Sequence, residues 1–254
     1  MLTILGPAKT IDMSPHGITE HHTLPQYLDQ AEELVNQLRQ YSLPRLKSLM
    51  KISDKLATLT FERYAGWRHS YSLEEGQQAI LAFSGEVFNG LQARSLSEGD
   101  LLFAQEHIRI LSGLYGVLKP LDIILPYRLE MGTKMPNPKG RDLYEFWKGT
   151  IPQRISEDTR KQDTPFLINL ASNEYFKSIQ PESFPCEIIT PVFKESHGPG
   201  FRNVTIYAKK ARGMMLRFII QNRINTPEYL KAFDEEGYYF NNDLSDEKEW
   251  VFCR

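Results

Sequence analysis

The sequence predicts an α/β (mixed α+β) fold, built as a single compact domain over residues 1–254, with a mixed sheet surrounded by helices. Apolar runs of strand length occur near both ends of the chain, and segments with helical periodicity lie between them. A chain of 254 residues is long enough to bury a large core. The loop-like segments 132–140 and 152–165 are followed at once by apolar periodic segments, so neither has the composition of a flexible linker.

The first quarter of the chain predicts a strand followed by two helices. Residues 1–5 form a short apolar run that stops at Gly6-Pro7, which is typical of a buried strand. Apolar residues recur at helical spacing over residues 24–38, with Thr23 as the expected N-cap. A second helix is predicted over residues 44–56.

Two capping boxes are expected next. Ser72 with Glu75, and Ser97 with Asp100, have the spacing of this motif. They predict helices that run to residue 83 and to about residue 111.

The last third of the chain predicts several strands and one amphipathic helix. Residues 209–223 are apolar on one face and cationic on the other, which indicates a surface helix. The expected strands are residues 166–171, 187–193, 204–208, 237–240 and 250–253.

Charge is unevenly distributed, although 30 Lys and Arg nearly balance 32 Asp and Glu. Residues 194–223 carry seven cations and one anion, whereas residues 224–254 carry three cations and eight anions. A near-neutral chain excludes a wholly basic nucleic-acid coat, so any affinity for phosphate must come from a local patch. Two interpretations stay open: the blocks pair across a surface, or the basic block is free to bind a polyanion.

Lys9 follows the first predicted strand, where a cation on a rigid element can meet a phosphate. Lys9-Thr10 resembles part of a phosphate-binding loop, but the spacing G-x-x-x-x-G-K-[ST] is absent and Pro7 has no backbone N–H. We therefore exclude a Walker-type nucleotide site. The alternative is that Lys9 is an exposed side chain in an ordinary turn.

The segment Gly113-Leu114-Tyr115-Gly116 is expected to be a turn after a helix. It is similar to the hairpin of a helix-hairpin-helix element, whose glycines let backbone N–H groups approach a DNA phosphate. It departs from that motif by one additional residue, and Pro120 limits where a second helix can begin. A helix C-cap with a tight turn is the alternative.

Two further segments place polar residues near the ends of elements. Asn173 and Glu174 follow a predicted strand, where polar residues often line a site in α/β folds, but simple helix capping explains them equally well. Lys209, Lys210 and Arg212 lie at the predicted start of a helix, where the helix dipole disfavours cations. This arrangement indicates that the segment binds phosphate.

Metal and nucleophile chemistry has little support. The histidines and cysteines show neither HExxH nor paired CxxC spacing, and no G-x-S-x-G segment is present. We expect no metal site and no cofactor. Two cysteines suit a reducing compartment. The sequence has no apolar run of membrane-spanning length and no signal-peptide pattern, so we expect a cytoplasmic protein without a membrane partner.

Taken together, these segments resemble the YaaA family of bacterial peroxide-stress proteins over nearly the whole chain. Long ungapped strings carry the resemblance, which makes it specific. They are residues 7–10 with Asp12, 52–57, 79–83 with Gly85 and Gly90, 111–118, 126–132, 169–172, 174–177 and 207–213.

The resemblance implies a single-domain α/β fold of unusual topology, with a positively charged cleft and a helix-hairpin-helix-like element. It also implies DNA binding and protection against hydrogen peroxide, associated with lower intracellular free iron. It brings no established enzymatic activity, so no catalytic residue is carried over.

Two functions from different classes follow. The first is a monomeric protective protein that binds double-stranded or distorted DNA. Its expected DNA-binding residues are Lys9, Lys55, Gly113, Gly116, Lys119, Arg128, Lys177, Lys209, Lys210 and Arg212.

The second is an enzyme acting on nucleic acid or a nucleobase, in which Lys9 works with Asp12, Asn173 or Glu174 as acid, base or nucleophile. A lysine and a carboxylate within hydrogen-bond reach in a concave pocket favour this second function. Direct iron chelation is a third possibility, which the lack of ligand spacing disfavours.

Overall fold

The computed structural model describes residues 1–15 and 17–254. Within them the main sheet has eight strands, in the order β11-β12-β9-β8-β1-β5-β6, with β10 paired to β9. The five strands from β12 to β5 run parallel to one another, and β11, β6 and β10 add antiparallel. These strands are β1 (Leu2–Leu5), β5 (Ile108–Ser112), β6 (Gly116–Leu118), β8 (Phe166–Asn169), β9 (Glu187–His197), β10 (Gly200–Arg202), β11 (Tyr239–Phe240) and β12 (Glu249–Cys253).

The central strands are covered on both faces, which is why their sequences are almost continuously apolar. Every residue of β1 and β5 is buried. The helix α10 (Thr205–Gln221) packs against α5 (Glu86–Leu91), α6 (Glu98–His107) and β9, and α8 (Thr150–Arg160) packs against β6. The buried apolar side chains form one continuous cluster from Met1 to Phe252. The predicted fold class, a mixed α/β single domain with helices around a mixed sheet, is confirmed.

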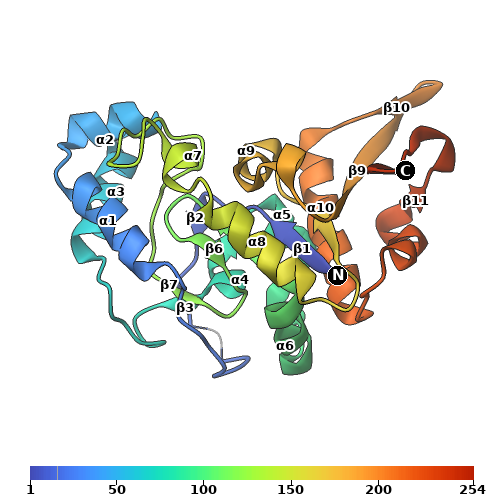
Figure 1. The fold of residues 1–254 in the computed structure, drawn as a ribbon, viewed down its shortest axis with the longest axis horizontal. Helices are drawn as coiled ribbons and strands as arrows, with labels where there is room; N and C mark the ends of the chain where they lie inside the picture. Colours follow the sequence, from blue (N-terminus) through green and yellow to red (C-terminus); the bar gives the residue numbers. More distant parts are fainter. Residues whose placement is uncertain (16) are drawn as a thin grey trace.

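Helices α1 to α3 gather at one end of the molecule and strands β9 to β11 at the other, with β1 between them (Figure 1). The remaining helices are α1 (Leu28–Arg39), α2 (Leu43–Met50), α3 (Asp54–Gly66), α4 (Ala79–Ala82), α7 (Leu143–Phe146) and α9 (Asn173–Phe176). The short strands are β2 (Thr10–Ile11), β3 (Gln77–Gln78), β4 (Phe83–Ser84) and β7 (Ile123–Ile124), which pair as β2–β4 and β3–β7. Short 3-10 turns occupy Ala93–Ser95, Lys177–Ile179, Pro181–Ser183, Pro227–Ala232, Glu235–Gly237 and Asn242–Leu244.

The capping box at Ser97 and Asp100 is confirmed, with both reciprocal hydrogen bonds present. The other predicted box does not open a long helix. Glu75 accepts a hydrogen bond from the Ser72 backbone N–H, but the chain then enters β3 and only α4 is helical. Pairing of β3 with β7 and of β4 with β2 decides the conformation there.

Two predicted helix boundaries in the first quarter are wrong. The first helix begins at Leu28 rather than after Thr23, because the Thr23 hydroxyl donates to the Asp122 carboxylate instead, at 2.5 Å. The helix predicted over residues 44–56 is two helices, separated where Lys51 adopts a left-handed conformation with φ of 52°. Ser53 then caps α3 by accepting from the Leu56 N–H.

The strand predicted over residues 204–208 is also wrong, because α10 already begins at Thr205. Its β-branched residues suit a strand, but the helix continues the apolar face that packs on α5. Lys209 and Arg212 therefore lie beyond the first turn of the helix, where the helix dipole acts on them less than the sequence indicated.

The predicted helix-hairpin-helix-like element is a β-hairpin. The preceding helix ends at His107, and residues 108–112 form β5 beside β1, because sheet pairing overrides the local helical pattern. Ser112 Oγ accepts the N–H groups of Leu114 and Tyr115 in the turn. These N–H groups are thus already used inside the protein.

Gly113 and Gly116 are both buried in this hairpin. A Cβ at Gly113 would lie 2.3 Å from the Leu129 carbonyl oxygen. Gly116 has a φ of +69°, and a Cβ there would lie 2.8 Å from the Trp147 ring. Close packing and backbone conformation therefore account for the two glycines.

Candidate functional site

A cleft of about 730 Å³ lies at the carboxyl ends of the neighbouring parallel strands β1 and β8. Residues 6–10 follow β1 and residues 172–175 follow β8, and both segments line it. The segment 127–130 and the helices α5 and α10 complete its walls. Ligands commonly bind at this position in α/β sheets, because the loops that leave neighbouring strands diverge there.

An ion pair connects two of these walls. The Lys9 ammonium lies 2.9 Å from Glu130 Oε2, and Arg128 donates to Glu130 Oε1 at 2.8 Å. The Lys9 side chain is 66% exposed, whereas the Arg128 side chain is only 13% exposed. The Nε atom of Arg128 is buried without a hydrogen-bond partner among the described residues. One carboxylate therefore lies between two cations, and the Arg128 guanidinium retains unused donor capacity.

Glu174 is held in the cleft wall by the backbone. Its Oε1 accepts the Gly132 N–H at 2.8 Å, and its carbonyl oxygen accepts from the Tyr144 hydroxyl. A Cβ at Gly132 would lie 3.1 Å from the same carboxylate oxygen. The glycine thus permits the close approach of the carboxylate to the backbone.

Two buried tyrosines also line the cleft. Burial raises the pKa of Tyr127 and raises that of Tyr175 well above its ordinary value. The Tyr127 hydroxyl shares a 2.7 Å hydrogen bond with Ser112 Oγ. Both hydroxyls stay protonated near neutral pH, so they supply hydrogen bonds and ring surface rather than charge.

The helices α5 and α10 lie side by side in the opposite wall (Figure 1), and they approach closely at two glycines. A Cβ at Gly90 would lie 2.1 Å from the Lys210 carbonyl oxygen, and one at Gly213 would lie 1.8 Å from the Val87 carbonyl oxygen. This packing brings Lys209 and Arg212 to the cleft.

Lys209 and Arg212 have no ion-pair partner within residues 1–15 and 17–254. Arg212 is partly buried, and burial lowers its pKa. A cation that is desolvated without a carboxylate beside it is favourably placed to bind an anion.

A second hollow of about 270 Å³ adjoins the cleft, and the two share Arg128, Glu130 and Glu174. Lys51 and Lys134 also line this adjoining hollow. Side chains of both charges line the cleft itself. The cations are Lys9, Arg128, Lys209 and Arg212, and the anions are Glu86, Glu130 and Glu174. With the adjoining hollow, the surface carries six cations and three glutamates.

Of the ten residues predicted to bind DNA, Lys9, Arg128, Lys209 and Arg212 line the cleft. Lys210 points away and pairs with Glu236. Lys177 lies over the Tyr144 ring, with its ammonium 5.6 Å from the ring centroid.

The other four predicted residues also lie outside the cleft. Lys55 is exposed on α3, and Lys119 lines a separate hollow. Gly113 and Gly116 are buried in the β5–β6 turn.

The residues named for an enzyme are only partly brought together. Asn173 and Glu174 line the cleft with Lys9. Asp12 does not, and instead lines a neighbouring hollow, where it pairs with Arg94. Hydrogen bonds from Ser14 and Arg94 hold the pKa of Asp12 well below its ordinary value.

The sequence reasoning missed four charged residues of the site, which are Glu130, Glu86, Lys51 and Lys134. Residues 127–131 alternate between apolar and charged side chains, and a period of two in an extended segment places Arg128 and Glu130 on the same side. That alternation was the available signal. Lys51 and Lys134 gave no comparable signal, because each belongs to an irregular segment.

No group of three or more His, Cys, Asp and Glu side chains with metal-binding geometry occurs over residues 1–15 and 17–254. In the same residues, no helix has both the length and the apolar character needed to cross a membrane.

Comparison with known families gives one match that spans almost the whole chain. The family model described as peroxide stress protein YaaA covers residues 1–244. This coverage includes the strands that carry the cleft and all four predicted cations that line it. The chain therefore belongs to the family of the peroxide stress protein YaaA.

Proposed function

We propose that this peroxide stress protein binds DNA through the cleft and the adjoining hollow. The observation that carries the proposal is the position of Lys209 and Arg212, which line the cleft opposite Arg128 without a carboxylate partner among the described residues. Phosphate contacts from Lys and Arg supply most of the affinity of proteins for nucleic acid. A cleft of about 730 Å³ is too small to enclose a duplex, whose major groove alone is about 12 Å wide and about 8.5 Å deep. We therefore propose that it takes the backbone of a distorted duplex or an unpaired nucleotide.

The test is a binding assay with duplex, bubble-containing and single-stranded DNA of one sequence over a series of salt concentrations. We expect the bubble-containing duplex to bind most tightly and log K to fall linearly with log salt concentration. Binding that does not change with salt would contradict phosphate recognition. We also propose that the protein acts as a monomer in the cytoplasm.

We also propose that this DNA binding protects the cell against peroxide and is associated with lower intracellular free iron. Cells that rely on this protein should lose peroxide survival when Lys209 and Arg212 are replaced together by Ala. Their chelatable iron, measured in parallel, should rise. If cells with this variant survive peroxide although the variant no longer binds DNA, protection does not depend on DNA binding and this part of the proposal is wrong.

The Lys9–Glu130 pair favours a second candidate, an enzyme acting on nucleic acid or a nucleobase. A lysine and a carboxylate 2.9 Å apart in a concave site can transfer a proton or present an amine. The substitution Lys9→Arg distinguishes the two functions, because arginine retains the charge but does not release its proton. A phosphate contact predicts that Lys9→Arg keeps DNA affinity and protection. An enzyme predicts that protection is lost as fully as in Lys9→Ala while DNA binding survives.

A further inference from the structure

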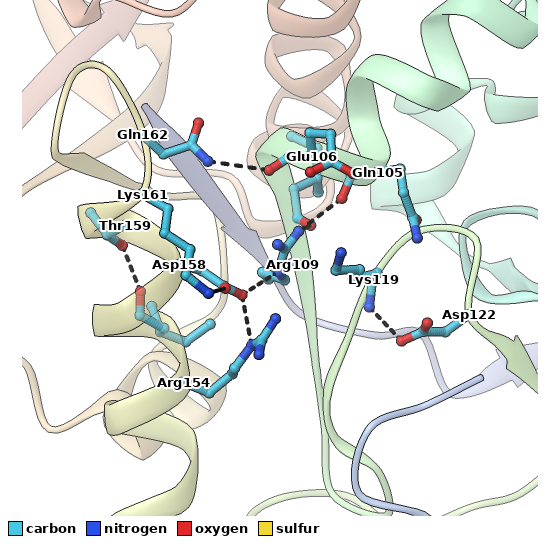
Figure 2. Close-up of polar contacts among 12 residues, drawn as sticks. Gln105, Glu106, Arg109, Lys119, Asp122, Arg154, Asp158, Thr159, Lys161 and Gln162 are labelled. Atoms are coloured by element: carbon cyan, nitrogen blue, oxygen red, sulfur yellow. Dashed lines mark hydrogen bonds and ion pairs between the residues drawn. The ribbon is translucent and has the colours of Figure 1, made fainter. Parts of the chain in front are cut away.

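A separate hollow of about 200 Å³ shares no lining residue with the cleft or with the adjoining hollow. Three cations line it: Arg109 from β5, Lys119 after β6, and Arg154 from α8. Figure 2 shows these side chains around Asp158 and Asp122. We name it the arginine hollow.

Arg109 is the most buried of these cations, with a side chain 4% exposed. Its Nε donates to Asp158 Oδ2 at 2.7 Å, and its Nη1 donates to the carbonyl oxygens of Gln105 and Ile108. The other amino group, Nη2, has no hydrogen-bond partner among the described residues. Because Arg109 lines the arginine hollow, this amino group is the part of its guanidinium that is left to bind a ligand there.

Arg154 shares the same carboxylate oxygen. Its Nε donates to Asp158 Oδ2 at 2.9 Å, and within the described part of the chain neither of its amino groups is hydrogen-bonded. The Lys119 ammonium forms no ion pair with any described residue. Asp158 therefore neutralises only one of the two guanidinium groups.

Asp122 is the opposing charge in the arginine hollow. Its two oxygens accept from the Thr23 hydroxyl at 2.5 Å and from the Lys119 backbone N–H at 2.7 Å. Burial raises the pKa of Asp122 to about 6, so a small further rise on binding an anion would neutralise it. With both aspartates ionised, the three cations still leave a local net charge of +1.

The size of the hollow selects the ligand. Sites for whole cofactors and drug-sized molecules occupy roughly 300–1,000 Å³, which is more than this hollow offers. Two planar guanidinium groups and an ammonium are the donor set that binds tetrahedral oxyanions best. We propose that the arginine hollow binds a phosphate group, either as inorganic phosphate or as the terminal phosphate of a small phosphorylated molecule.

Isothermal titration of the full chain tests this, with inorganic phosphate and glycerol phosphate as separate probes at constant ionic strength. Binding of inorganic phosphate alone, or of both probes, supports a free-ion site. Binding of glycerol phosphate alone supports a phosphomonoester site. No heat and no shift in melting temperature with either probe at millimolar concentrations overturns the proposal.

Lys119→Ala should weaken binding roughly tenfold, because one charge-assisted hydrogen bond is lost, and Lys119→Arg should restore most of it. Lys161→Ala is the matched control, since Lys161 lies 4.0 Å from Asp158 but does not line the hollow. Equal loss in Lys161→Ala and Lys119→Ala would show nonspecific charge attraction and overturn the site. DNA affinity should not change in Lys119→Ala, so this test is independent of the function of the cleft.

Discussion

Lys9 and Glu130 form a 2.9 Å ion pair that joins the loop after β1 to the segment after β7 in the lining of the cleft. Glu130 also accepts from Arg128, so this single carboxylate occupies two of the cations that face the cleft. A phosphate that enters the cleft has to compete with it.

The first prediction concerns Glu130→Gln. Removing the carboxylate frees Lys9 and Arg128, so DNA affinity at low salt should rise severalfold if the cleft binds phosphate. Glu236→Gln is the control, because Glu236 pairs with Lys210 and Arg254 away from the cleft. Fluorescence anisotropy measures both. Loss of peroxide protection with DNA binding intact would instead support the enzyme.

The second prediction compares adjacent lysines. Lys209→Ala should weaken DNA binding roughly threefold to tenfold and reduce the slope of log K against log salt by about one, because one phosphate contact is lost. Arg212→Ala should do the same. Lys210→Ala should leave the slope unchanged, because this side chain pairs with Glu236. The same effect for Lys209 and Lys210 would show that general charge, and not the cleft, binds DNA.

The third prediction concerns the β5–β6 turn. Gly116→Ala should destabilise the protein by about 2 kcal/mol or more, since it combines a positive φ with contact against the Trp147 ring. Gly198→Ala has a φ of +57° but open space around it, so it should cost only about 1 kcal/mol. Denaturant titrations give both values. DNA affinity of folded Gly116→Ala should equal that of the unsubstituted protein. A loss of DNA affinity without a loss of stability would indicate that the turn contacts phosphate.

The fourth prediction concerns the buried pair of Arg109 and Asp158. Both side chains are at most 4% exposed, so Asp158→Asn leaves a buried guanidinium without its counter-charge. The free energy of unfolding should fall by about 3 kcal/mol. Asp54→Asn breaks an exposed pair with Lys47 and should leave the unfolding midpoint nearly unchanged. Equal effects of the two substitutions in urea titrations would show that Asp158 is not an essential buried counter-charge of Arg109.

The fifth prediction is a pH dependence that comes from Asp122. Its pKa is raised to about 6 from an ordinary value of 3.8, so the folded protein binds this proton more tightly than the unfolded chain does. The stability from this group is fully present below about pH 4 and is lost as pH rises to about 6, by about 3 kcal/mol in all.

Asp122→Asn removes this contribution, so the stability difference between the two proteins should change over pH 4–6 and stay constant above it. His107, whose pKa is lowered by burial, contributes with the opposite sign near the upper end of this range. Its contribution is common to both proteins and cancels in the difference. A difference that does not vary with pH would show that Asp122 titrates normally.

The sequence predicted those elements whose own residues determine them. The apolar run at residues 1–5 became β1, and the box at Ser97 and Asp100 caps α6, because burial of a continuous apolar segment and local side-chain hydrogen bonds act over a few residues. Long ungapped strings were enough to identify the family, and the four cations that line the cleft were all among the residues predicted to bind DNA.

Tertiary structure alone decided the turn at Gly113–Gly116 and the pairing of Lys9 with Glu130. Residues 108–112 have a pattern compatible with a helix, and hydrogen bonding to β1, more than 100 residues earlier in the sequence, makes them a strand. Lys9 and Glu130 are likewise distant in sequence, and the sheet brings their loops together. Local sequence fixes backbone preferences and side-chain chemistry, whereas contacts between distant segments depend on how the whole core packs, and these contacts formed the cleft.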